Sequence, residues 1–201
     1  MKSKVISLEE RDKILEVFRE SKQYFEEVIV NLPKDIHQAI NRIMKYYSKQ
    51  LDESPKQISK SMNWQKRIGL EGWEVFFCPE TDNYRFVIEN IEPQEVIYDV
   101  GAGDLRLDLV LSQRCKKVYA VEINPMIIGK SIELIGYDMP KNLISICADA
   151  LKFPLPKDVT TIVVLVRHLI HPLPEEWYEK RIISNDNYQP LYILEDKVKG
   201  S

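Results

Sequence analysis

The first 70 residues carry apolar side chains at helical spacing. Between residues 8 and 32, and again after Pro33, apolar positions recur three, four or seven residues apart, which places them on one face of a helix. The two stripes are Ile14, Phe18, Phe25, Val28, Ile29 and Leu32, then Ile36, Ala39, Ile40, Ile43, Met44, Tyr47 and Leu51. We predict two amphipathic helices that pack on each other, and assign residues 1–70 to a helical N-terminal region that acts as a lid or in recognition.

The pattern changes in residues 71–201, where short apolar runs alternate with helical segments. A helix capped by Thr81 or Asp82 is followed by predicted strands at 96–100, 117–122, 143–147 and 160–166, helices over 105–114 and from Asn124 to near Gly136, and a last short strand at 191–194. Strands separated by helices of about a dozen residues require right-handed crossovers. We therefore predict an α/β domain over 71–201 with a doubly wound, mostly parallel, Rossmann-like sheet.

Composition narrows the class of protein. The 201 residues, 44% of them hydrophobic, can form one full domain and a smaller appendage. The N-terminus has no signal-peptide pattern, and the longest aliphatic run, at 162–166, is too short to span a membrane. Cys78, Cys115 and Cys147 lack the spacing of a zinc site or a disulfide framework. We expect no membrane anchor, no metal, and a cytoplasmic location.

The charge is unevenly distributed around the net value of −3. Residues 1–70 contain 14 Lys and Arg against 10 Asp and Glu, whereas the remaining residues contain 14 against 21. A basic region attracts polyanions, but this excess also fits a solvated helical face. RNA is thus one expected partner of the N-terminal region, and an ordinary charged surface is the alternative.

A glycine-containing turn follows the first predicted strand. The strand at 96–100 includes one charged residue, Asp99, and leads into Gly101 and Gly103. Glycine lets a backbone turn sharply and approach a ligand, and the next helix presents free N–H groups at its start. The turn predicts a nucleotide-like ligand.

These residues resemble the class I S-adenosylmethionine-dependent methyltransferases. The turn Asp99-Val-Gly-Ala-Gly103, Glu122 at the end of the second strand and Asp149 after the third occur in the order found in that family. The resemblance implies that S-adenosylmethionine is the cofactor, with Asp99 at its methionine end, Glu122 on the ribose hydroxyls, and Asp149 with the adjoining Ala150 at the adenine. It covers about residues 77–170.

A nicotinamide or flavin dinucleotide domain is the nearest alternative. Its fingerprint requires a third small residue, and that place holds Arg106, whose bulk opposes the close approach of helix and strand. The dinucleotide fingerprint also has no use for Asp99. Both features favour the methyltransferase.

The methyl acceptor is less well defined by the sequence. After the fourth strand the chain has Arg167, His168 and His171, where amino-group methyltransferases often place Asn or Asp with prolines and an aromatic residue. Either histidine can accept a proton near neutral pH and Arg167 can hold a phosphate or carboxylate, so these three are the catalytic candidates; a structural role in a loop is the alternative. The stretch 148–156 is similar to one in ribosomal RNA adenine dimethyltransferases, which favours RNA as acceptor.

The end of the chain is short for this family, whose sheet normally has seven strands. We expect the usual final hairpin to be missing. The chain is then a trimmed enzyme, or completes its sheet or active site with a second copy or another partner chain, or binds the cofactor without catalysis. The alternative to an enzyme is accordingly a non-catalytic S-adenosylmethionine-binding or scaffold protein that needs such a partner.

Overall fold

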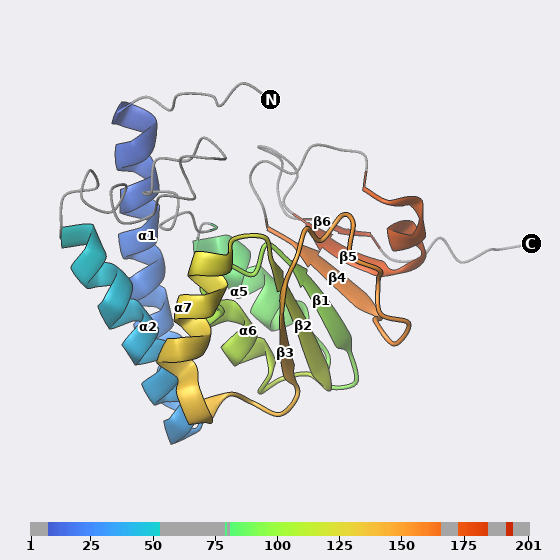
Figure 1. Ribbon diagram of the computed structural model, residues 1–201, viewed down its shortest axis with the longest axis horizontal. Helices are drawn as coiled ribbons and strands as arrows, with labels where there is room; N and C mark the ends of the chain where they lie inside the picture. Colours follow the sequence, from blue (N-terminus) through green and yellow to red (C-terminus); the bar gives the residue numbers. More distant parts are fainter. Residues whose placement is uncertain (1–7, 53–78, 80, 166–172, 185–191, 195–201) are drawn as a thin grey trace, which may run out of the picture.

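A computed structural model describes residues 8–52, 79, 81–165, 173–184 and 192–194 of the chain (Figure 1). The N-terminal region forms two long helices, α1 (Leu8–Val28) and α2 (Lys34–Asp52), joined through the short 3-10 helix η1 (Ile29–Asn31). This confirms both predicted amphipathic helices. Among the helices of the described residues, none is long and apolar enough to cross a membrane.

The described strands form one six-stranded sheet in the order β3-β2-β1-β4-β5-β6. All neighbouring pairs are parallel except β5 and β6, which are antiparallel. The bounds are β1 (Val96–Val100), β2 (Lys117–Glu122), β3 (Leu143–Cys147), β4 (Thr161–Val164), β5 (Arg181–Ser184) and β6 (Tyr192–Leu194). The chain runs outward from β1 to β3 and then returns to β4 on the other side of β1, so a topological switch point lies between β1 and β4. The predicted Rossmann-like, mostly parallel sheet is confirmed.

Within the described residues, three further α-helices accompany the sheet: α5 (Thr81–Asn90), α6 (Arg106–Leu111) and α7 (Pro125–Ile135). A 3-10 helix, η3 (Gly136–Asp138), continues α7. The predicted cap of α7 is present, since Asn124 Oδ1 accepts hydrogen bonds from the backbone N–H groups of Met126 at 3.0 Å and Ile127 at 3.1 Å. Gly136, with φ +60°, ends the helix as expected.

Helices α1 and α2 belong to the same hydrophobic core as α5, α6, α7 and one face of the sheet. Figure 1 shows all five helices on that side. In α2 the predicted stripe is buried throughout, from Ile36 to Tyr47, with no member more than 2% exposed. Arg42 also joins α2 to the end of α7, because its guanidinium donates to the Leu134 and Ile135 carbonyls at 2.6 and 3.0 Å. The division at residue 70 remains a prediction, and the described helices pack directly on the α/β part.

The opposite face of the sheet has a smaller core centred on Trp177, which lies in the 3-10 helix η4 (Glu175–Glu179). Its ring packs edge-on against Tyr98 of β1, with centroids 5.8 Å apart. Neither η4 nor β5 was predicted from the sequence. Strand β5 has only four residues, too few for an alternating pattern to be recognised, although both of its isoleucines are fully buried.

Candidate cofactor site

The turn after β1 is fixed by hydrogen bonds to the neighbouring strand. The backbone N–H groups of Gly101 and Ala102 both donate to the Val121 carbonyl of β2, at 2.8 and 3.1 Å. Gly101 has φ +75° and Gly103 has φ +59°, a region in which a side chain is strained. The two glycines are therefore required by the path of the backbone at the carboxyl end of the sheet.

Glu122 is the next residue of this site and lies at the end of β2. Its side chain is only 7% exposed, and its oxygens accept hydrogen bonds from the backbone N–H of Gly103 at 2.9 Å and of Asn124 at 2.7 Å. Burial raises the pKa of Glu122, and these two N–H groups act in the opposite direction. The carboxylate is thus held in one orientation and keeps acceptor capacity for a hydroxyl donor. The structure brings the predicted ligands Gly103 and Glu122 into direct contact.

Asp99 is buried next to a second carboxyl group. It is 3% exposed on β1, and Asp108 of α6, which was not singled out from the sequence, is fully buried beside it. Burial raises the pKa of Asp99 to about 7, and the nearby Glu122 adds to the rise. Burial raises the pKa of Asp108 well above its usual range as well, with the Asp99 charge as a further cause.

Asp99 and Asp108 form a pair of buried carboxyl groups next to the glycine turn. Both oxygens of Asp108 are buried and have no hydrogen-bonding partner among the described residues. Burial without such a partner favours the neutral form of a carboxyl group.

Asp149 and Ala150 follow β3 on the same edge of the sheet. Cys147 pairs in register with Glu122, and the Ala148 N–H donates to the Glu122 carbonyl at 3.1 Å, which places Asp149 close to the end of β2. The Asp149 carboxylate pairs with the exposed Lys152 at 2.8 Å, and this bond lowers its pKa. The adjoining Ala150 is buried and its carbonyl accepts a hydrogen bond from the Tyr98 hydroxyl at 3.2 Å.

Two exposed apolar residues adjoin these carboxylates. Ile123, directly after Glu122, is 64% exposed, and Leu151, shortly after Asp149, is 42% exposed. Each is a single large apolar residue among polar or small neighbours, so no periodic pattern in the sequence indicates it. Two apolar side chains are thus exposed close in sequence to Glu122 and Asp149.

Arg106 occupies the position that distinguishes this turn from a dinucleotide fingerprint. Its side chain is 3% exposed and pairs with Asp104 at 2.8 Å. It extends to α1, where it contacts the Ser21 hydroxyl at 3.3 Å and lies over the rings of Phe18 and Phe25. The arginine thus links the turn to the N-terminal helices, a role that sequence reasoning missed. The preceding Leu105 has φ +65°, a strained value for a residue with a side chain.

The catalytic candidates Arg167, His168 and His171 lie outside the described residues. In sequence they follow β4, at the carboxyl end of the parallel strands. Among the described residues there is no group of three or more His, Cys, Asp or Glu side chains that could hold a metal ion. Cys115 and Cys147 are free thiols.

The fold is Rossmann-like, and Gly103, Glu122 and Asp149 lie together at the carboxyl ends of its parallel strands. No protein-family model matches the chain. It is 30% identical to a probable ribosomal RNA small subunit methyltransferase A of Pyrobaculum islandicum over 90 residues, 45% of this chain and 37% of the relative. A protein of the same name from Methanosarcina acetivorans is 37% identical over 71 residues, 35% of this chain and 26% of the relative.

The chain therefore spans little more than a third of the length of these curated relatives at most. Among solved structures, it is similar to the 23S rRNA methyltransferase ErmE, with a TM-score of 0.44 and 18% identity over 52% of this chain and 46% of that chain. A SAM-dependent methyltransferase from Aquifex aeolicus gives a TM-score of 0.42 and 21% identity over 51% and 62% of the two chains. The curated relatives confirm the resemblance to methyltransferases that the sequence predicts.

Proposed function

We propose that this protein is an S-adenosylmethionine-dependent methyltransferase that acts on RNA in the cytoplasm. The observation that carries the proposal is the fixed Glu122 carboxylate, oriented by the N–H groups of Gly103 and Asn124 at the end of β2. A carboxylate at this place in a Rossmann-like sheet accepts hydrogen bonds from ribose hydroxyls. The RNA acceptor is supported by the names of the curated relatives, which are ribosomal RNA methyltransferases.

The residues present fit the cofactor. Glu122 has acceptor capacity for ribose, Asp149 for an adenine amino group, and Ile123 and Leu151 offer apolar surface for the base between them. The Asp99 carboxyl supplies oxygen acceptors for an ammonium group. When bound, S-adenosylmethionine supplies a methyl group on a positively charged sulfur.

Methyl transfer places few demands on protein side chains, because the leaving group is already charged and catalysis consists mainly of alignment. The turn of Gly101 and Gly103, which is fixed to β2 by backbone hydrogen bonds, would orient the ligand. In this proposal His168 or His171 takes the proton released by the acceptor, and Arg167 holds a phosphate of the RNA. Helices α1 and α2 serve recognition of the RNA.

Calorimetry with S-adenosylmethionine and S-adenosylhomocysteine tests the cofactor assignment, and labelled methyl transfer into separated RNA, DNA, protein and metabolite fractions tests the acceptor. We expect binding of both ligands and label in RNA. Absence of binding would refute the cofactor assignment. Binding without transfer into any fraction would favour the non-catalytic alternative, in which a second copy or another partner chain completes the sheet.

Asp149→Ala is the sharper test of the site, because Glu122 also holds the glycine turn and its loss would disturb the backbone. The variant should bind S-adenosylmethionine at least about tenfold more weakly, since a hydrogen bond to a charged group contributes about 1.5 to 3 kcal/mol. Asp158→Ala is the matched control: Asp158 also pairs with a lysine, Lys117, but precedes β4 and so lies at the amino end of the sheet. Equal affinities of the two variants would show that the site is mapped wrongly.

A further inference from the structure

Four acidic side chains are buried among the described residues, and they differ in what balances their charge. Glu95 pairs with Arg181 at 2.8 Å, and Glu122 accepts hydrogen bonds from two backbone N–H groups. Asp99 and Asp108, next to the glycine turn, have neither a cation nor an N–H group of another described residue as a partner. A buried carboxyl group without such compensation is favoured in its neutral, protonated form.

The missing compensation has a consequence for the cofactor. We propose that Asp99 is protonated in the free protein and gives up its proton when the ammonium group of the cofactor binds. The O–H bond of the carboxyl group breaks, the proton passes to the solvent, and a carboxylate remains opposite the ammonium group. The identity of the ligand rests on the proposed function, whereas the protonated state of Asp99 rests on the buried pair.

The side chains around Asp99 offer it no positive charge. In the sheet it pairs in register with Ala120 of β2 and Val163 of β4, both apolar. Burial raises the pKa of Asp99 to about 7, and the charge of Glu122 at the end of β2 adds to the rise. Asp108 of α6 acts in the opposite direction without cancelling this rise.

Asp108 itself is held neutral by its surroundings. Burial raises its pKa well above the usual range, with the Asp99 charge as a further cause. Asp104 of the turn also acts on it, and the cation beside Asp104 is already engaged, since Arg106 pairs with Asp104 at 2.8 Å. The Cys115 thiol, which follows α6, carries no charge near neutral pH, because burial raises its pKa to about 11. Asp99 is therefore the member of the pair that titrates near neutral pH.

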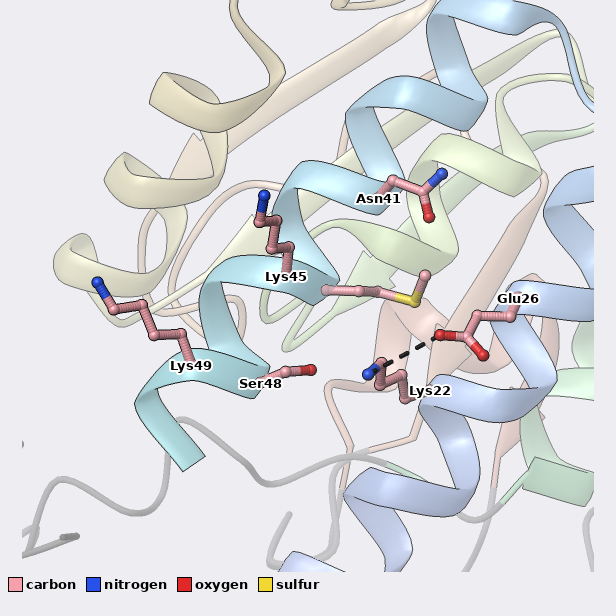
Figure 2. A pocket seen from close by; sticks show the side chains of 7 residues that line it. Lys22, Glu26, Asn41, Lys45, Ser48 and Lys49 are labelled. Carbon is pink, nitrogen blue, oxygen red and sulfur yellow. Dashed lines mark ion pairs between the residues drawn. The ribbon is translucent and has the colours of Figure 1, made fainter. Parts of the chain in front are cut away.

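The lysines that line the groove between α1 and α2 do not supply the missing charge either. Figure 2 shows Lys22 paired with Glu26, 3.8 Å away, whereas Lys45 and Lys49 extend from the side of α2 that faces away from this ion pair. None of these lysines affects the pKa of Asp99. Within the described part of the chain no cation reaches Asp99, and the ammonium group of a ligand would be the first to do so.

The expected effect follows from the charge of the ligand. An opposite charge within about 4 to 6 Å lowers the pKa of a carboxyl group by about 1 to 3, so direct contact is not required. From a starting pKa of about 7, this fall releases about 0.4 to 0.9 proton per ligand at about pH 6 and about 0.1 or less at about pH 8. Affinity should accordingly rise about tenfold from about pH 5.5 to about pH 8.

Isothermal titration calorimetry of S-adenosylhomocysteine with the full chain measures the released proton directly. The binding enthalpy is compared in two buffers of different ionisation enthalpy, phosphate and imidazole, and the difference gives the number of protons released. Methylthioadenosine keeps the base and the ribose but has no ammonium group. It should bind without releasing a proton, which separates Asp99 from Glu122 as the source.

Asp99→Asn should abolish both the proton release and the rise of affinity with pH, because the amide does not titrate. Asp149→Asn is the matched control at the same site. Asp149 pairs with the exposed Lys152, which lowers its pKa, so it is ionised over the whole pH range and its replacement should leave the proton release unchanged. Proton release that persists in Asp99→Asn, or equal release with methylthioadenosine, would overturn the proposal.

These outcomes are separate from methyl transfer. If S-adenosylhomocysteine binds wild type without proton release, the cofactor assignment stands and the coupling to Asp99 is refuted. If protons are released but no label enters RNA, the coupling stands and the proposed acceptor fails. Absence of binding would refute the cofactor assignment and the coupling together.

Discussion

The burial of Asp99 beside Asp108 makes a quantitative prediction about stability. An aspartate in an unfolded chain ionises near pH 3.9, whereas the pKa of the buried Asp99 is about 7. Between these two values the folded protein holds a proton that the unfolded chain has released. The free energy of unfolding therefore falls as pH rises, by about 1.4 kcal/mol for each pH unit, and the loss is complete once the pH exceeds about 7.

Asp99→Asn removes the part of this dependence that comes from Asp99, because the amide carries no titrating proton. Relative to wild type, the variant should gain stability progressively from about pH 4 to about pH 7, reaching about 4 kcal/mol, and should then keep that difference. Urea denaturation followed by circular dichroism at several pH values measures the effect. Asp35→Asn, which changes an exposed carboxylate in the first turn of α2, serves as the control.

A difference between Asp99→Asn and wild type that does not change between pH 4 and pH 7 would refute the reasoning. Such a result would mean that Asp99 ionises in the folded protein as it does in the unfolded chain. The measurement is made without cofactor, so it tests the buried pair independently of any ligand. Asp108→Asn should change stability in the same direction, because it replaces the other member of the pair by a neutral donor.

Three further substitutions test the surroundings of the turn by urea denaturation. Leu105→Gly relieves a left-handed backbone conformation that costs about 1 to 2 kcal/mol, but it also removes a fully buried leucine side chain that contributes about 2 to 5 kcal/mol. The variant should therefore be less stable than wild type, and a stabilised variant would contradict this balance. Arg106→Met leaves Asp104 buried without its ion pair and should lower the free energy of unfolding by about 3 kcal/mol or more. The double variant Arg106→Met/Asp104→Leu should recover most of this stability. No recovery would mean that the packing of Arg106 on α1 matters more than its ion pair. Asn124→Ala removes the cap of α7 and should cost about 1 kcal/mol, and an unchanged stability would show that the cap is not needed.

The parts of the fold that could be predicted are those set by local pattern. The stripe of α2 has an unbroken helical period, and the cap and end of α7 follow from Asn124 and Gly136, so each leaves a signal within a few residues. Strand β5 is only four residues long and becomes a strand because it pairs with β4 and β6. Its structure depends on tertiary contacts, which override a weak local preference.

The residues of the candidate site also differ in whether the sequence alone could predict their place. Glu122 and Asp149 could be placed because the ends of parallel strands meet at one edge of a sheet, whatever the details of packing. Asp108 could not, because an aspartate in the first turn of a helix is ordinarily a favourable, exposed residue, and its burial against Asp99 depends on how α6 packs on β1. The contact between Arg106 and Ser21 joins residues 85 positions apart, and a single sequence contains no sign of it.

That long-range contact explains why the N-terminal helices form one body with the cofactor turn. Arg106 begins α6, pairs with Asp104 of the turn, and is enclosed by two aromatic rings of α1. Because a buried charge that loses its partners is costly, α1 cannot move away from the turn without a penalty of several kcal/mol. Helix α2 is joined to the end of α7 by Arg42, whose guanidinium donates to the last backbone carbonyls of that helix. Helices α1 and α2 are therefore held in a fixed position relative to Gly103 and Glu122.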